Sequence, residues 1–236
     1  MRSPRSLARI AGLFYLVVAV LGGFAHFFSR GEVYRPGDAT GTARNVVANA
    51  GLVRAGFVAD LVQAVFFLLL AMTFYLLLKH VNKNAARTMV IFVAVAVSII
   101  CLNMVHQLAA LLVATDASYA GALGAQGSDA LVLLMLDLQH YGYLVAQIFF
   151  GLWLLPLGYL VHRSGMFPRV LGVLLVLGCA GYLLDTFALF LAPDLGAALE
   201  PFAVAPAAVA EISMLLWLFV KGVRTPSGDG HVLAAA

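Results

Sequence analysis

Long apolar stretches alternate along the chain with short connections that carry most of the charged residues. A helix needs about 20 residues to cross a hydrocarbon core about 30 Å thick, and six stretches are long enough. They are residues 7–29, 52–78, 88–113, 131–161, 169–192 and 203–220. Lipid offers no partner for free backbone N–H and C=O groups, so these stretches must be helical. The pattern predicts an all-α fold, a polytopic membrane bundle of six transmembrane helices in one domain over residues 1–224.

The Lys and Arg residues are divided unevenly between the two sides of this arrangement. One side holds ten of them with Asp229, and the other holds six acidic residues and four arginines, Arg30, Arg35, Arg44 and Arg54. Short cytoplasmic loops of membrane proteins are enriched in Lys and Arg. The distribution therefore predicts that both termini are cytoplasmic.

Composition favours a membrane protein over a soluble one. Hydrophobic residues make up 63% of the chain, charged residues 11%, and the mean hydropathy is +1.00. A soluble domain has about 25% charged residues. The net charge of +3 comes from basic residues scattered over short loops, so the expected partner is the lipid bilayer and not a nucleic acid. Cys101 and Cys179 lie in apolar stretches without a Cys-x-x-Cys pattern, which indicates small buried hydrophobic residues.

Three segments outside the main pattern also carry predictions. The first apolar stretch is longer than a typical signal-peptide core, so we expect a retained helix and not a cleaved signal. In residues 39–50, apolar positions recur at helical spacing after a possible cap at Asp38. They indicate either a short amphipathic helix at the outer membrane surface or an extension of the second span. The polar tail, residues 225–236, is predicted to be disordered.

The apolar stretches contain polar side chains, which are costly in lipid unless they find a partner or a wet cavity. At 1.5 Å per residue from the outer end of each stretch, the ionisable ones lie about 9 to 14 Å deep. This depth predicts a polar layer in the outer half of the bundle, supplied by five helices. Shared helix faces add amides and a tyrosine to the layer. The candidate ligand-binding residues are Asp60, Gln63, Asn103, His106, Gln107, Asp137, His140, Tyr141, Gln147, Asp185 and Glu211.

Two interpretations of the layer need no chemical reaction. The groups can simply hydrogen-bond one helix to another, each bond contributing about 1 kcal/mol. They can also form the floor of an outward-facing pocket for a small amphipathic or lipid-like ligand, which is the leading functional hypothesis. Aromatic residues available for its walls are Tyr15, Phe66, Phe67, Tyr141, Tyr143 and Tyr182.

Two other function classes stay open. A metal-dependent membrane hydrolase would use His and carboxylate side chains to hold Zn²⁺ and activate water, although no H-E-x-x-H motif assigns its ligands. A proton-coupled transporter would change the protonation of Asp60, Asp185 or Glu211. Soluble-enzyme motifs are absent, and the pair Gly178 and Gly181 indicates close helix packing. The sequence therefore assigns no metal, cofactor, reaction or oligomeric state.

Two long stretches resemble an uncharacterised bacterial family of six-helix membrane proteins, a domain-of-unknown-function family. They are VYRPGDATGTARNVVANAGLVRAGFVADL and YGYLVAQIFFGLWLLPLGYLVHRSGMFPRVLGVLLVLGCAGYLLD. The resemblance covers about Ile10 to Asp194 and implies a six-helix bundle in a prokaryotic cytoplasmic membrane, without any activity. Family members often carry His where this chain has Gln139, and the shift to His140 turns the imidazole about 100° around the helix. That shift argues against a shared metal or haem role for this position.

Overall fold

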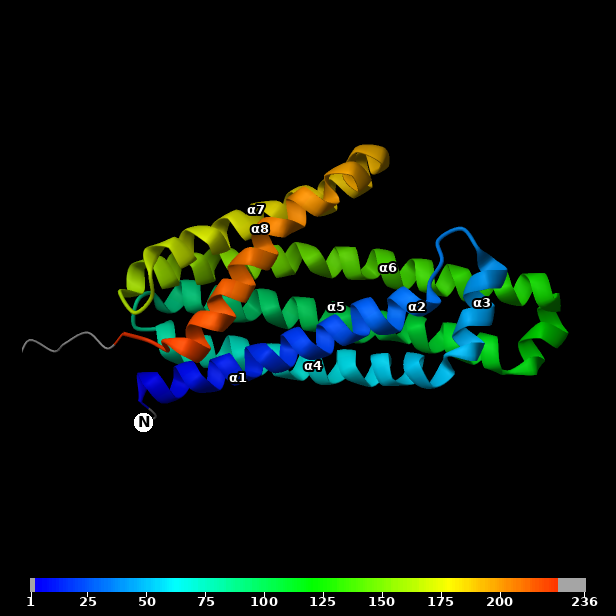
Figure 1. The fold of residues 1–236 in the computed structure, drawn as a ribbon, viewed down its shortest axis with the longest axis horizontal. Coiled ribbons are helices and arrows are strands. Elements are labelled where there is room, and N and C mark those ends of the chain that lie inside the picture. The colour runs from blue at the N-terminus through cyan, green and yellow to red at the C-terminus, as the bar shows by residue number, and fades with distance from the viewer. Residues whose placement is uncertain (1–2, 225–236) are drawn as a thin grey trace, which may run out of the picture.

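The computed structural model describes residues 3–224, and this part of the chain is helical throughout apart from short connections (Figure 1). Six segments are long and apolar enough to cross a membrane, which confirms the predicted fold class. The first of these segments combines α1, a π-helical segment and α2. The elements are α1 (Pro4–Gly23), η1 (Phe24–Arg30), α2 (Gly31–Val33), α3 (Ala39–Ala48), α4 (Ala50–Leu78), α5 (Lys83–Thr115), α6 (Ala117–Ser164), α7 (Arg169–Leu191) and α8 (Pro193–Val220). The predicted disorder of residues 225–236 lies outside the described residues.

Side chains of the connections start the helices by accepting hydrogen bonds from free N–H groups of the first turn. Asp38 accepts from the Gly41 N–H at 2.8 Å, so the cap predicted for this position is present. Asn82 and Asp116 serve α5 and α6 in the same way. α6 ends at Ser164, and the next residue, Gly165, has a φ of +66°, which suits a residue without a Cβ.

Several helices extend beyond the apolar stretches. α6 begins at Ala117 and α8 at Pro193, so the segments predicted as outer loops, residues 114–130 and 193–202, are largely helical. Apolar length measures what lies in lipid, whereas a helix continues until a cap or a break ends it. Within α6, Gly124 has a φ of +72° and a ψ of 160°, which interrupts the helix there. α3 is a separate helix, because Asn49 between it and α4 has a non-helical backbone.

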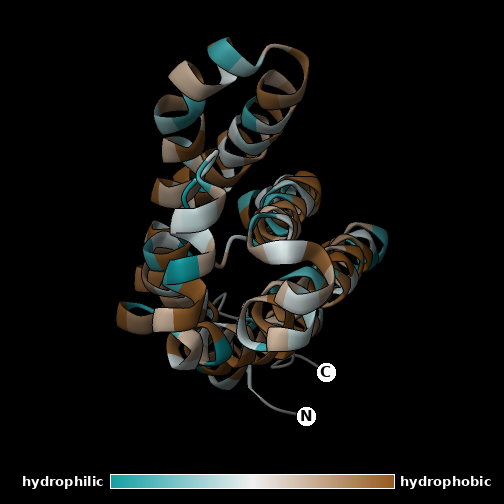
Figure 2. Ribbon diagram, turned by 90° about the vertical axis from the view of Figure 1, so that its right-hand side faces the viewer, coloured by the Kyte–Doolittle hydropathy of each residue, from teal (hydrophilic) through white to brown (hydrophobic). Residues whose placement is uncertain are grey.

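Helices that follow one another in the chain pack side by side, and α8 returns to contact α1. Figure 1 shows the α7–α8 hairpin tilted relative to α4, α5 and α6. Seen along the bundle, hydrophobic positions occupy most of each helix (Figure 2). Many large apolar side chains, such as Leu102 and Phe202, lie on the surface, as lipid contact requires. Cys101 is also exposed, so its predicted burial is wrong, whereas Cys179 is buried. Cys101 belongs to this lipid-facing surface, where a small hydrophobic residue needs no cover.

An apolar core fixes the half of the bundle that contains the chain ends. Trp153 of α6 is fully buried, and its ring packs edge-on against Tyr15 of α1 and Phe67 of α4. Phe74 completes this contact from the next turns of α4. The core therefore fixes α1, α4 and α6 against one another. The same three helices supply polar side chains within about three turns of this core.

Candidate functional site

A buried ion pair joins the end of the first span to the middle of α4. Arg30 Nη1 donates to Asp60 Oδ2 at 2.5 Å, and the side chains are 11% and 2% exposed. Removing one partner of such a pair leaves an uncompensated buried charge and costs about 3–5 kcal/mol. Asp60 thus has the partner that its position in an apolar helix requires.

The π-helical segment η1 determines where Arg30 lies. A π-helix is wider than an α-helix and is frequently found at functional sites. The Arg30 guanidinium lies over the Tyr143 ring of α6, 5.5 Å from its centroid, in a cation–π geometry. The His26 ring, from the same segment, lies 5.8 Å from the Tyr143 ring. Tyr143 also lies within electrostatic range of Asp60 and of Glu211 of α8.

Glu211 of α8 is held by tyrosines from two other helices. The Tyr15 hydroxyl of α1 donates to Oε1 at 3.0 Å, and the Tyr182 hydroxyl of α7 donates to Oε2 at 2.9 Å. Both carboxyl oxygens therefore have a partner from a different helix. We call the six residues Arg30, Asp60, Tyr143, Tyr15, Tyr182 and Glu211 the polar cluster.

One turn from Tyr182, a second buried carboxylate borders the polar cluster. Gln147 Nε2 donates to Asp185 Oδ2 at 2.6 Å and also contacts the Thr186 hydroxyl at 3.2 Å. The other oxygen of Asp185 is buried and has no hydrogen-bond partner. Tyr182 interacts electrostatically with both Glu211 and Asp185. A buried polar atom without a partner is rare in native structures, so this oxygen calls for an explanation.

A second group of candidate residues lies nearer the outer ends of α5 and α6. The Tyr34 hydroxyl donates to Asp137 Oδ1 at 2.7 Å, and burial together with this bond raises the pKa of Tyr34. Asn103 Nδ2 donates to the Gln139 carbonyl at 2.7 Å, and Asn103 Oδ1 lies 3.1 Å from His106 Nδ1. The Asn103–Gln139 bond joins α5 to α6, and Tyr34 joins the segment after α2 to α6, as the structural interpretation of the layer expects. The Asn103–His106 contact lies within α5.

The remaining candidates are dispersed. Gln107 Nε2 donates to the Val53 carbonyl at 3.1 Å, which ties α5 to α4. Gln63 is buried against Gly22 of α1. His140 and Tyr141 lie on the exposed side of α6, and the Tyr141 side chain is 53% exposed. Of the candidates, Asp60 and Glu211 belong to the polar cluster, and Gln147 and Asp185 border it. None of the other seven forms a hydrogen bond or ion pair with the polar cluster, although His140 lies within electrostatic range of Arg30.

Sequence reasoning missed Arg30, which it counted among the outer-loop cations. The signal that could have found it is Asp60 itself, because a buried carboxylate needs a cation and Arg30 ends the neighbouring span. Tyr15, Tyr143 and Tyr182 were expected only as aromatic wall residues, yet each contacts a charged group here. Within residues 3–224, no three His, Cys, Asp or Glu side chains lie close enough together to hold a metal ion.

Six long apolar helices, with buried charged side chains among them, define a polytopic membrane protein. The chain belongs to the family described as domain of unknown function DUF4386, which matches residues 10–222. It is similar to an uncharacterized protein of Archaeoglobus fulgidus, with 27% identity over 154 residues, 64% of this chain and 74% of that protein. No solved structure matches the chain.

Proposed function

We propose that the protein lies in a prokaryotic cytoplasmic membrane, with both termini cytoplasmic, and binds a small amphipathic molecule at the polar cluster. The observation that carries the proposal is the buried Arg30–Asp60 ion pair, together with a Glu211 carboxylate held by two tyrosines, inside apolar helices. Ionisable groups at such positions are costly and by default mark a functional site. Hydrogen bonds that only attach one helix to another would not require Asp185, a further carboxylate with a buried oxygen that has no partner.

The charge of the site favours a particular head group. Arg30 is the one cation of the polar cluster, whereas Asp60, Glu211 and the neighbouring Asp185 supply three carboxyl groups. Carboxylates only accept hydrogen bonds. We therefore expect the ligand to be a cationic or hydrogen-bond-donating amphiphile, whose apolar part contacts the surrounding aromatic side chains.

Mass spectrometry of molecules that co-purify with the full-length protein tests this proposal. The wild type is expected to carry an enriched amphiphile, and Glu211→Gln with Asp185→Asn is expected to lose at least about 90% of it, which corresponds to a tenfold weaker affinity. The matched control is Glu200→Gln, an exposed carboxylate on the same helix. Equal occupancy in the wild type and the double variant, or no enriched species in the wild type, contradicts the proposal.

Elemental analysis of the same preparation separates the binding protein from the hydrolase alternative. Stoichiometric zinc, manganese or iron would favour the metal-dependent hydrolase. The proton-coupled transporter is distinguished by proton uptake into proteoliposomes, which Glu211→Gln would abolish only if this carboxylate carries the proton. Neither outcome is expected from a protein that only binds an amphiphile.

A further inference from the structure

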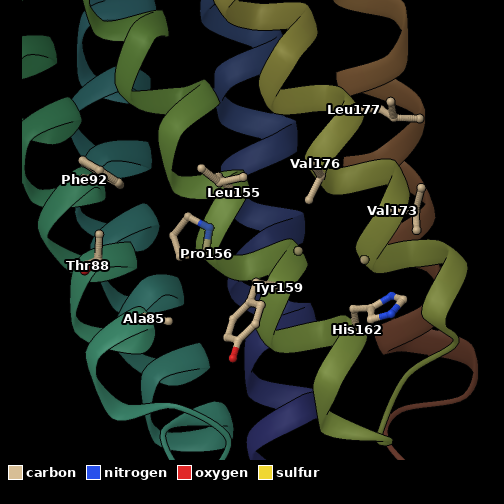
Figure 3. Close-up of a pocket in the computed structure, with 12 residues that line it drawn as sticks. Ala85, Thr88, Phe92, Leu155, Pro156, Tyr159, His162, Val173, Val176 and Leu177 are labelled. Carbon is tan, nitrogen blue, oxygen red and sulfur yellow. The ribbon is translucent and has the colours of Figure 1, made fainter.

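An open apolar groove lies between α5, α6 and α7, away from the polar cluster (Figure 3). Its volume is about 770 Å³, within the usual range of small-molecule sites, about 300–1,000 Å³. On α6, sixteen residues separate Tyr159, which lines the groove, from Tyr143 of the polar cluster, or about 24 Å of helix. Figure 3 shows lining side chains from all three helices, among them Thr88, Phe92, Pro156, Tyr159, Val173 and Val176.

Close packing of α6 and α7 forms the floor of this groove. A Cβ added to Gly158 would lie 2.7 Å from the Gly172 carbonyl oxygen, so the two backbones touch. Farther along, His162 Nδ1 lies 3.4 Å from the Arg169 carbonyl oxygen. Large apolar side chains on the walls, such as Val173 and Val176, are partly exposed. In a bilayer, such a floor and such walls fit a hydrocarbon chain.

Basic residues continue the walls of the groove toward the end of the bundle. Arg163 follows Tyr159 by four residues and Arg169 precedes Val173 by four, so each shares a helix face with a lining residue. Both arginines are exposed, as are Lys83 and Arg87 at the start of α5. None of these four forms an ion pair with another described residue. The mouth of the groove therefore combines an apolar slot with unpaired positive charge.

We propose that this groove binds an anionic phospholipid, with an acyl chain between α5, α6 and α7 and its phosphate at Arg163 and Arg169. Basic pockets between transmembrane helices are suited to phospholipid head groups, and Arg binds phosphate oxygens with two parallel N–H donors. The site is independent of the polar cluster and does not rest on its proposed ligand. In the predicted orientation it faces the inner leaflet, which carries anionic lipid.

Native mass spectrometry of the full-length protein in detergent, titrated with phosphatidylglycerol or phosphatidylcholine of identical acyl chains, tests the site. Phosphatidylglycerol is expected to bind at least about tenfold more tightly, a preference that Arg163→Gln with Arg169→Gln removes. The matched control, Arg44→Gln with Arg54→Gln, removes two exposed cations at the other end and should leave binding unchanged. Equal binding of the two lipids, or unchanged binding to the Arg163/Arg169 variant, overturns the proposal.

Two more arms test the role of the groove itself. Val173→Trp and Thr88→Phe each fill it from a different helix and are expected to weaken phosphatidylglycerol binding, so that either one suffices if the other fails to fold. Glycerol phosphate, which lacks acyl chains, is expected not to compete. Full competition by glycerol phosphate would show that the arginines bind a free phosphate. Undiminished phosphatidylglycerol binding to a folded Val173→Trp or Thr88→Phe variant would show that no acyl chain occupies the groove.

Discussion

At the scale of single residues, Arg30 is expected as a loop cation, whereas the structure buries it beside Asp60. A positive charge beside a membrane span predicts contact with water, and Arg30 was counted that way. The requirement that Asp60 find a partner follows from the sequence, since an isolated carboxylate in an apolar helix is costly. The sequence makes Arg30 a candidate partner because it ends the neighbouring span, but its contact with Asp60 depends on the π-helical segment that ends at Arg30. Sequence periodicity assumes regular helices and misses such a segment.

Arg30→Gln is expected to destabilise the protein by about 3–5 kcal/mol, because Asp60 then carries a buried charge without a counter-ion. The double variant Arg30→Gln/Asp60→Asn should be less destabilised than the sum of the single variants, since neither charge is left alone. Unfolding of the purified protein in mixed micelles, followed by circular dichroism, measures both free energies. Arg54→Gln, an exposed arginine of α4, is the control. If Arg30→Gln behaves like that control, the ion pair does not stabilise the fold.

At the scale of helices, the number and approximate position of the spans follow from the sequence, but their ends and contacts do not. The outer part of α6, rich in Ala, Gly and Ser, gives no apolar signal, yet it is helical on both sides of the break at Gly124. At one place the sequence does predict a close contact between small residues of two helices. Gly178 was expected to mark close packing, and a Cβ added there would lie 2.9 Å from the Ala207 Cα of α8, which confirms the expectation.

Gly178→Ala is expected to cost about 1–3 kcal/mol, because the added methyl group pushes α7 away from α8. Gly51→Ala is the matched control, since a Cβ there meets nothing within 4 Å. Alanine has the higher helix propensity, so this control should be neutral or stabilise by up to about 1 kcal/mol. Thermal unfolding monitored by tryptophan fluorescence compares the two variants. Opposite signs support the packing assignment, and equal effects contradict it.

At the scale of the whole molecule, the candidate layer divides into two groups. Depth alone groups Asp137 and His106 with Asp60 and Glu211. Counting residues from the end of a span gives the height of a side chain along the bundle, but not the side of the helix on which it lies. In the structure Asp137 is held by Tyr34, and His106 by Asn103, apart from the polar cluster. Which side chains meet depends on helix rotation and tilt, and a single sequence specifies these only through the packing of all six spans.

Topology is also a property of the whole molecule. Reporter fusions after Lys83 and after Asp116 are expected to report opposite compartments, because α5 crosses the membrane between them. The fusion after Lys83 should report the cytoplasm, as the distribution of Lys and Arg predicts. Paired alkaline phosphatase and fluorescent protein fusions measure this in intact cells. The same compartment for both positions would exclude the six-span arrangement.

The π-helical segment η1 has a consequence for comparing this chain with its relatives. A regular α-helix turns about 100° per residue, so one deletion between Phe24 and Arg30 would rotate the guanidinium away from Asp60. Length in this segment and the presence of an acid at the position of Asp60 are therefore expected to change together during evolution. Relatives that are one residue shorter in this segment should carry a neutral side chain at the position of Asp60. A single gap in an alignment would then indicate that the buried ion pair is absent.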